Sequence, residues 1–130
     1  MAAFPISLVT PERILFEGDA EMVVMRSGGG DIAFLAGHEP YVSTVEIGVV
    51  RIDRPDGEKE RFAAHGGFVE VDEGKVVVLS GVAERADEID VARAQRAKEE
   101  AEGRAGGGDD PEAEAALSRA TARLEVVEQS

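Results

Sequence analysis

The sequence contains no cysteine and no tryptophan, and only 5% of its 130 residues are aromatic. Without cysteine, the chain forms no disulfide and offers no thiolate to a metal ion. With so few aromatic side chains, it lacks the stacking surfaces on which proteins bind single-stranded nucleic acid. The formal net charge of -13 also repels a phosphate backbone. Nucleic acid is therefore excluded as a partner.

Long hydrophobic runs are absent as well. No apolar segment approaches the roughly 18–20 residues that a membrane-spanning helix requires. The first five residues, MAAFP, lack the basic and apolar regions of a signal peptide. We therefore expect a cytosolic chain that is associated with a membrane only through a protein partner. Its length gives room for one moderate core or two small units.

Two parts of the chain show different patterns, and together they predict a segregated α+β fold. Residues 1–86 contain short apolar segments between turns spaced roughly 8–12 residues apart, which is typical of an antiparallel β-sandwich or flattened barrel of about ten strands. Val76–Leu79 is apolar on both faces, so we expect it to be covered on both sides. The clearest strands are Ile6–Val9, Arg13–Phe16, Ala20–Arg26, Ile32–Leu35, Tyr41–Val45, Val49–Asp53, Glu58–Ala64, Phe68–Val71 and Lys75–Ser80.

Residues 87–130 predict a hairpin of two helices. The segment from Ile89 to Glu102 is rich in strong helix formers, and the glycine-rich run 103–108 interrupts it. A second helix then begins, with aspartate at 109 or 110 as its N-cap and Pro111 in its first turn. Most apolar positions are alanine, which buries little surface, so the hairpin is marginally stable unless it docks. Such a hairpin can rearrange without unfolding the β-sandwich.

Catalytic and metal-binding patterns are missing from the sequence. His38 and His65, the two histidines, occur in none of the paired spacings that zinc sites use. The triple glycines at 28–30 and 106–108 are not followed by the Lys-Ser/Thr of a phosphate-binding loop, so we interpret them as a turn and a hinge. A β-sandwich hydrolase or metal enzyme that uses both histidines is one alternative, and this residue inventory argues against it.

The order of motifs in the second half of the β-rich part is the most informative feature of the chain. A glycine pair introduces a strand through a bend that glycine tolerates easily, an acidic turn follows, and a second strand leads into the first helix. The motifs are HGGFVEV at 65–71, KVVVL at 75–79, AE at 83–84 and DEID at 87–90. In this order and spacing they resemble the epsilon subunit of F-type ATP synthases.

The front of the chain supports the same resemblance, which covers essentially all 130 residues. Ala33 and Ala36 stand where the family usually has Gly and Pro, a difference that concerns the local backbone path. The matching segments are VTPERILFEG at 9–18, GGG at 28–30, IAFL at 32–35 and GHEP at 37–40.

The resemblance implies a non-catalytic rotor subunit that requires no cofactor. Its β-domain, residues 1–86, would bind the gamma subunit and sit on the ring of c subunits at the cytoplasmic face of the cell membrane. It would help couple proton-driven rotation to the catalytic head of alpha and beta subunits. The hairpin, residues 87–130, would fold against the β-domain in one state and extend along gamma in another, where it restrains ATP hydrolysis.

Two loops are our candidates for the end of the β-domain that faces the ring. The first is the glycine turn that contains Gly28 and Asp31. The second is the loop of His38, Pro40 and Tyr41. Tyrosine is enriched at protein interfaces because it combines a large apolar body with a polar tip.

Some bacterial members of the resembled family bind ATP through a motif Ile-Asp-x-x-Arg-Ala-x-x-Ala, and the sequence reads IDVARAQRA at 89–97. The resemblance therefore implies a regulatory ATP site, although Glu100 stands where ATP-binding members often have arginine. The alternative is a solvated helix face whose ion pairs are worth little. A stand-alone ATP-sensing module is the alternative for the whole chain. The matching site positions are Glu84, Ile89, Asp90, Arg93, Ala94, Arg119 and Arg123.

Overall fold

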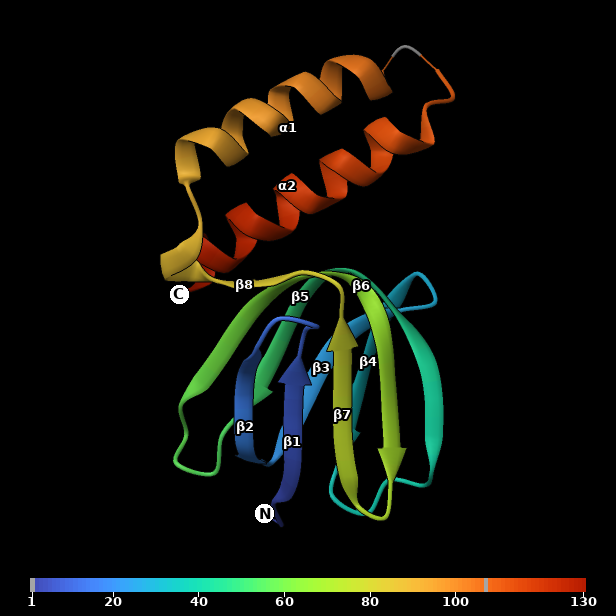
Figure 1. The fold of residues 1–130 in the computed structure, drawn as a ribbon, viewed down its shortest axis with the longest axis vertical. Helices are drawn as coiled ribbons and strands as arrows, with labels where there is room; N and C mark the ends of the chain where they lie inside the picture. The colour runs from blue at the N-terminus through green and yellow to red at the C-terminus, as the bar shows by residue number, and fades with distance from the viewer. Residues whose placement is uncertain (1, 107) are drawn as a thin grey trace.

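A computed structural model describes every residue of the chain except Met1 and Gly107. The strands form one curved sheet, and a helical hairpin lies across one end of it (Figure 1). This arrangement confirms the segregated α+β fold. The elements are β1 (Phe4–Val9), β2 (Ile14–Ala20), β3 (Met22–Ser27), β4 (Gly30–Leu35), β5 (Tyr41–Asp53), β6 (Lys59–Asp72), β7 (Lys75–Ser80), β8 (Ala83–Arg85), the 3-10 turn η1 (Ala86–Glu88), α1 (Val91–Ala105) and α2 (Pro111–Gln129).

The strand order is β2-β1-β7-β6-β5-β3-β4, and β8 pairs with β6. β1 and β7 run parallel, whereas β5 and β6 form a long antiparallel ladder. The curved sheet encloses the main core on its inner side, where side chains of alternate residues meet. Its largest members include Phe34, Phe62, Leu8 and Ile52, each at most 1% exposed.

The described residues form eight strands, and not the ten or so that the sequence predicted. β5 and β6 each include two predicted strands, 41–45 with 49–53 and 58–64 with 68–71. The ladder continues through both midpoints, because Ile47 pairs with His65 and Val45 pairs with Gly67. Glycine within a strand can mark a bend instead of an end. The glycine signals therefore overstated the number of strands.

Gly67 allows a close approach between β6 and β7. Its φ is +148°, and a Cβ added there would lie 1.9 Å from the carbonyl oxygen of Leu79. The preceding Gly66 also has a positive φ, of +90°. The expected glycine bend is thus confirmed, and the absence of a side chain at Gly67 is a steric requirement.

Both helices begin at an aspartate cap, which the sequence predicted for the second helix. The side chain of Asp90 accepts a hydrogen bond from the Arg93 amide at 3.1 Å, and that of Asp110 accepts one from the Ala113 amide at 3.0 Å. Pro111 begins α2, as expected. The predicted end of α1 at Glu102 is wrong, because the helix continues to Ala105. A single glycine within a helix costs only about 1 kcal/mol, which neighbouring helix formers offset.

α2 lies between α1 and the sheet, so the sheet contacts of the hairpin are made mainly through α2 (Figure 1). Ala122 and Val126 of α2 pack against Ala63 of β6, with Ile47 and Val49 at the margin. This contact is small and consists of short side chains, so it stabilises docking weakly. Gly107, part of the predicted hinge at 106–108, lies outside the described residues.

Candidate functional site

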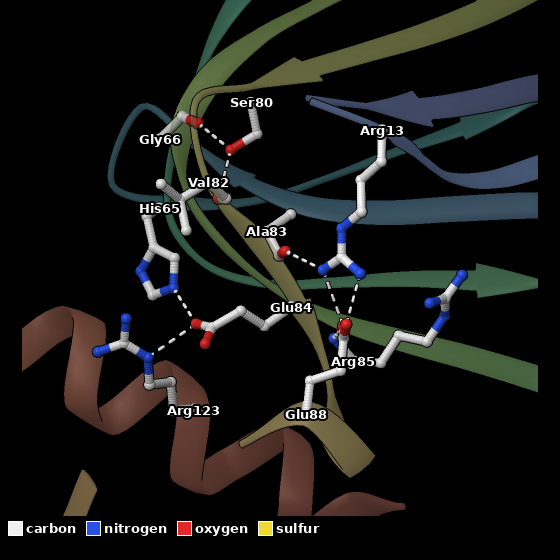
Figure 2. Close-up of polar contacts among 10 residues, drawn as sticks. All are labelled: Arg13, His65, Gly66, Ser80, Val82, Ala83, Glu84, Arg85, Glu88 and Arg123. Carbon is white, nitrogen blue, oxygen red and sulfur yellow. Dashed lines mark hydrogen bonds and ion pairs between the residues drawn. The ribbon is translucent and has the colours of Figure 1, made fainter. Parts of the chain in front are cut away.

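A polar cluster joins the sheet to the C-terminal half of α2 (Figure 2). Glu84 of β8 lies between His65 of β6 and Arg123 of α2. Its Oε1 atom accepts a hydrogen bond from Arg123 Nε at 2.7 Å and lies 2.8 Å from His65 Nε2. With a neutral imidazole, Nε2–H donates to this oxygen. One carboxylate oxygen therefore links three elements, and we call these three residues the docking triad.

The docking triad is largely shielded from water. Burial raises the pKa of Glu84, but hydrogen bonds from Arg123 and His65 outweigh it, and the pKa lies below its usual value. Burial lowers the pKa of His65, outweighs the hydrogen bond with Glu84, and is reinforced by the charges of Arg123 and Arg119. The His65 side chain is only 4% exposed. Among the described residues, nothing hydrogen-bonds to its Nδ1 atom. The site therefore favours a neutral imidazole beside an ionised carboxylate.

A second polar cluster fixes the chain just before the hairpin (Figure 2). Arg13 Nη2 donates to Glu88 Oε1 at 2.9 Å and to the Ala83 carbonyl at 3.2 Å, and Nη1 also contacts the Glu88 carboxylate. The Arg85 amide donates to Glu88 Oε1 at 2.8 Å, and its guanidinium donates to the Leu15 carbonyl at 2.7 Å. η1 is thereby attached to the β1–β2 end of the sheet.

Glu88 should stabilise the fold in a defined pH range. Hydrogen bonds from Arg13 and from the Arg85 amide lower the pKa of Glu88 from 4.5 to about 2. Because the folded-state pKa is depressed, the stabilisation is present above about pH 4.5 and is lost as the pH falls toward 2. We expect Glu88→Gln to lower the free energy of unfolding at pH 7 by at most about 1 kcal/mol, because solvent screens the pair. Urea unfolding at pH 7 and pH 2.5 measures this, and an equal deficit at both would contradict the assignment.

The structure brings together part of the predicted ATP site. Glu84 and Arg123 are in direct contact, and Arg119 lies one turn before Arg123 on α2. Arg119 donates to the exposed Glu112 at 2.8 Å. Arg93 is exposed near the start of α1, and within the described part of the chain its guanidinium makes no hydrogen bond or ion pair. Two of the three predicted arginines thus have carboxylate partners in this structure.

The other predicted ATP-site residues have structural roles here. Asp90 caps α1 with its carboxylate. Ile89 packs against the small cluster that includes Ala122 and Val126. Ala94 is 3% exposed in the hairpin. Helix capping and packing therefore explain three residues of the motif at 89–97 without a bound ligand.

Sequence reasoning assigned no role to His65 in docking. The histidine is 19 residues from Glu84 and 58 from Arg123 along the chain, so no local motif joins them. A signal was nevertheless present. Two-residue alternation puts His65 on the same side of β6 as Ala63, and a polar residue beside a small apolar one on that face is compatible with a helix contact.

The two predicted ring-facing loops lie at opposite ends of β4 (Figure 1). Gly28 has a φ of +62° in the β3–β4 turn, and Asp31 lines a cleft with Glu125 and Gln129 of α2. That turn is therefore on the hairpin side of the sheet. The two loops therefore do not lie at one end of the sheet, because a six-residue strand separates them, and the assignment of either loop to the ring stays a prediction.

The second loop forms an aromatic group at the end remote from the hairpin (Figure 1). The His38 ring lies 4.8 Å from the Phe34 ring and 5.8 Å from the Tyr41 ring, centroid to centroid. Pro40 is exposed, and Tyr41 is 37% exposed. This loop thus presents apolar surface to solvent, and Phe34 anchors it in the core.

The described residues contain no cluster of histidine and carboxylate side chains suited to a metal ion. None of the described helices combines the length and apolarity needed to cross a membrane.

Comparison with known proteins gives the same family over both parts of the chain. Residues 3–86 match the family described as ATP synthase, Delta/Epsilon chain, beta-sandwich domain. Residues 87–128 match the family described as ATP synthase, Delta/Epsilon chain, long alpha-helix domain. The ATP synthase epsilon chain of Desulforudis audaxviator is 48% identical over 76% of this chain and 72% of its own. That of Shouchella clausii is 41% identical over 97% of this chain and 96% of its own.

Solved structures show the same fold. A chain in the Euglena gracilis mitochondrial ATP synthase, OSCP/F1/c-ring, aligns with a TM-score of 0.74 and 25% identity, covering 98% of this chain and 79% of its own. A chain in the Tetrahymena thermophila ATP synthase central stalk and c-ring aligns with a TM-score of 0.57 over 96% of this chain and 93% of its own. At 14% identity, the second similarity concerns the fold alone.

Proposed function

Because this chain belongs to the ATP synthase delta/epsilon family, we propose that its β-sandwich attaches it to the rotor and that its hairpin regulates ATP hydrolysis. The chain is an epsilon subunit of an F-type ATP synthase, a non-catalytic component of the central stalk. Proton transport follows from the complex as a whole. The division of labour between residues 1–86 and 87–130, and the partner of each, are our proposal.

An exposed apolar surface supports attachment through the β-sandwich. Phe68 is 56% exposed and pairs with Leu79, which is 48% exposed. Val42, 68% exposed, lies on the same face, two residues from the partner of Phe68 in β5. The prediction that Val76–Leu79 is covered on both sides is therefore wrong for this chain alone. Contiguous apolar surface of this kind marks protein-binding sites, and we assign this outer face to the gamma subunit.

The loop at the end remote from the hairpin is our candidate for contact with the c-ring. Leu35, at the end of β4, is 48% exposed, and His38 packs against the rings of Phe34 and Tyr41. This end is accessible while the hairpin is docked at the opposite end of the sheet (Figure 1). The β-sandwich would then contact the ring on the cytoplasmic face of the membrane and gamma along its side, and so help couple rotation to the catalytic head.

The weak docking of the hairpin supports a regulatory role. Of the residues that the structure describes, only Ala63, Ala122 and Val126 are buried in the cluster between α2 and the sheet. The docking triad adds one shared carboxylate. Two states that differ by a few kcal/mol can be exchanged by a ligand or a partner that prefers one of them. We propose that the compact hairpin seen here is one state and that the other extends along gamma toward the alpha and beta subunits.

The experiment that tests this function uses the cognate F1 sector stripped of its epsilon subunit. We expect the full chain to rebind and to slow ATP hydrolysis several-fold. A chain that ends at residue 90 keeps Glu88 and should rebind equally well without slowing hydrolysis. Equal inhibition by both chains would show that the hairpin has no regulatory role, whereas failure of the shorter chain to bind would contradict attachment through the β-sandwich.

We also propose that ATP binds the compact hairpin as a regulatory ligand. Arg119 and Arg123 both lower the pKa of His65, so both positive charges lie close enough to His65 to act on it. Arg93 is available on α1. Guanidinium groups form strong charge-assisted bonds to phosphate, which would compete with Glu84 for Arg123. Glu100, where ATP-binding members often have arginine, removes one positive charge from this region.

Thermal unfolding tests the ATP proposal. ATP at about 100 times its dissociation constant should stabilise the compact state by roughly 2.7 kcal/mol, with a corresponding rise in Tm. The variant with Arg93→Ala, Arg119→Ala and Arg123→Ala should lose this rise. Arg54→Ala, in the exposed β5–β6 turn, is the matched control and should keep it. No rise for the wild-type chain at millimolar ATP would leave the hairpin as a mechanical element only.

A further inference from the structure

The His65 ring lies where the hairpin meets the sheet, and the surrounding charges make its protonation state important for docking. Only 4% of the side chain is exposed. It lines a cleft of about 750 Å³ between β5 and α2, through which protons can reach the buried ring. The charged groups around the ring are Glu84 of β8, Arg119, Arg123 and Glu125 of α2, Arg26 of β3 and Glu46 of β5.

Neutral His65 is compatible with the observed contacts. Its Nε2–H donates to Glu84 Oε1, and the unpartnered Nδ1 is an acceptor. A protonated ring would place a second N–H in a buried position where the described residues offer no acceptor. Leaving a buried donor unsatisfied is costly, and more so when the group is charged.

Protonation would also unbalance the charges of the docking triad. His65 Nε2 and Arg123 Nε already share the same oxygen of Glu84. A charged imidazole would place two cations on one carboxylate, and the charge of Arg119 would oppose it as well. The other nearby carboxylates offer limited compensation. Glu46 accepts a hydrogen bond from the Gly29 amide at 2.6 Å, and Glu125 is exposed.

We propose that His65 makes hairpin docking sensitive to protons, so that protonation of its ring releases α2 from the sheet. Undocking removes Arg119 and Arg123 and admits water, while Glu84 stays beside the ring on β8. The undocked chain therefore binds the proton more tightly than the docked chain. By linkage, docking is strongest when the pH is above the pKa of undocked His65, and it weakens as the pH falls through that value. His65 is thus a positioning residue for the hairpin.

This inference rests on the proposed function only in the effect that undocking of the hairpin has on ATP hydrolysis. If the free hairpin restrains ATP hydrolysis, then acidification of the compartment that holds the hairpin would increase the restraint. Histidine is suited to this role because it is the side chain that ordinarily titrates between pH 5 and 8. The depressed pKa of docked His65, caused mainly by burial, is consistent with this direction.

Hydrogen exchange of the full chain between pH 8 and pH 5.5 tests the proposal. Exchange rates are expressed as protection factors, which remove the intrinsic pH dependence of the chemistry. We expect protection of α2 amides to fall with decreasing pH, by about tenfold for each unit that separates the docked and undocked pKa values. Amides in the centre of β6 should keep their protection. Glu88 does not titrate in this range, because its pKa is about 2.

Two variants complete the test. His65→Gln keeps an N–H that can reach Glu84 but does not titrate, so protection of α2 should become independent of pH. His38→Gln removes the other histidine, in the β4–β5 loop, and should retain the wild-type pH dependence. A pH-independent α2 in the wild-type chain, or an unchanged response in His65→Gln, would overturn the inference. If α2 amides exchanged only through global unfolding, together with those of β6, both the regulatory hairpin and the role of His65 would be wrong. If α2 opened separately from β6 but without dependence on pH, only the role of His65 would be wrong.

Discussion

Gly67→Ala should prevent the β-sandwich from folding or lower its free energy of unfolding by more than about 4 kcal/mol. The new Cβ would lie 1.9 Å from the Leu79 carbonyl oxygen and 2.9 Å from the Ser80 Cα. These are backbone atoms held in the β6–β7 ladder, so no rotation of a side chain relieves the contact. The φ of +148° adds backbone strain for any residue with a Cβ.

Gly103→Ala is the matched control for this substitution. Gly103 is exposed within α1, and a Cβ there would meet no atom within 4 Å. Because alanine favours a helix over glycine by up to about 1 kcal/mol, this variant should be slightly more stable than the wild type. Urea unfolding followed by circular dichroism compares the two, and a Gly67→Ala chain as stable as the control would disprove the close strand approach.

Phe68→Asp should weaken attachment to gamma by roughly 30-fold or more while leaving the isolated chain folded. Phe68 is 56% exposed, so aspartate meets solvent and not the core. In an interface, the same change would bury a charge against the apolar surface of Leu79 and its partner. Large aromatic side chains dominate interface energies, and losing one costs about 2 kcal/mol or more, which corresponds to a roughly 30-fold weaker affinity.

Val91→Asp provides the comparison for Phe68→Asp. Val91 is 38% exposed at the first position of α1, where an acidic residue is favourable. It also replaces an exposed apolar side chain by a carboxylate, but on the hairpin, so affinity for gamma should stay at the wild-type value. Binding measured by titration calorimetry distinguishes the variants. Equal affinity of the wild-type, Phe68→Asp and Val91→Asp chains would show that the apolar face around Phe68 does not bind gamma.

Local signals allowed the sequence to predict much of the fold. Asp110 and Pro111 mark the start of α2, because capping depends on residues that are neighbours in the chain. The bend at Gly67 was predicted for the same reason, since it reflects the backbone freedom of one residue. The strand count was wrong because strand continuity depends on the partner strand, and β5 and β6 support each other through their midpoints.

The docking contacts could not be predicted, because they join residues far apart in the chain. Arg13 and Glu88 are separated by 75 residues, and Glu84 and Arg123 by 39. The exposure of Leu79 was missed for a different reason. An apolar strand has the same sequence pattern whether its own chain or another subunit covers it. Family resemblance identified Glu84 and Arg123, but only the structure shows that they hold each other and His65.

In our proposal, the β-sandwich stays attached to the rotor while the hairpin occupies two positions. Because the sequence has no native cysteine, spin labels can be placed with Glu39→Cys in the remote loop and Ser118→Cys on α2, both exposed. Electron–electron distance measurements should give one distance for the isolated chain and a second, longer distance once the chain is assembled on F1. A single unchanged distance in both samples would show that the hairpin keeps one position.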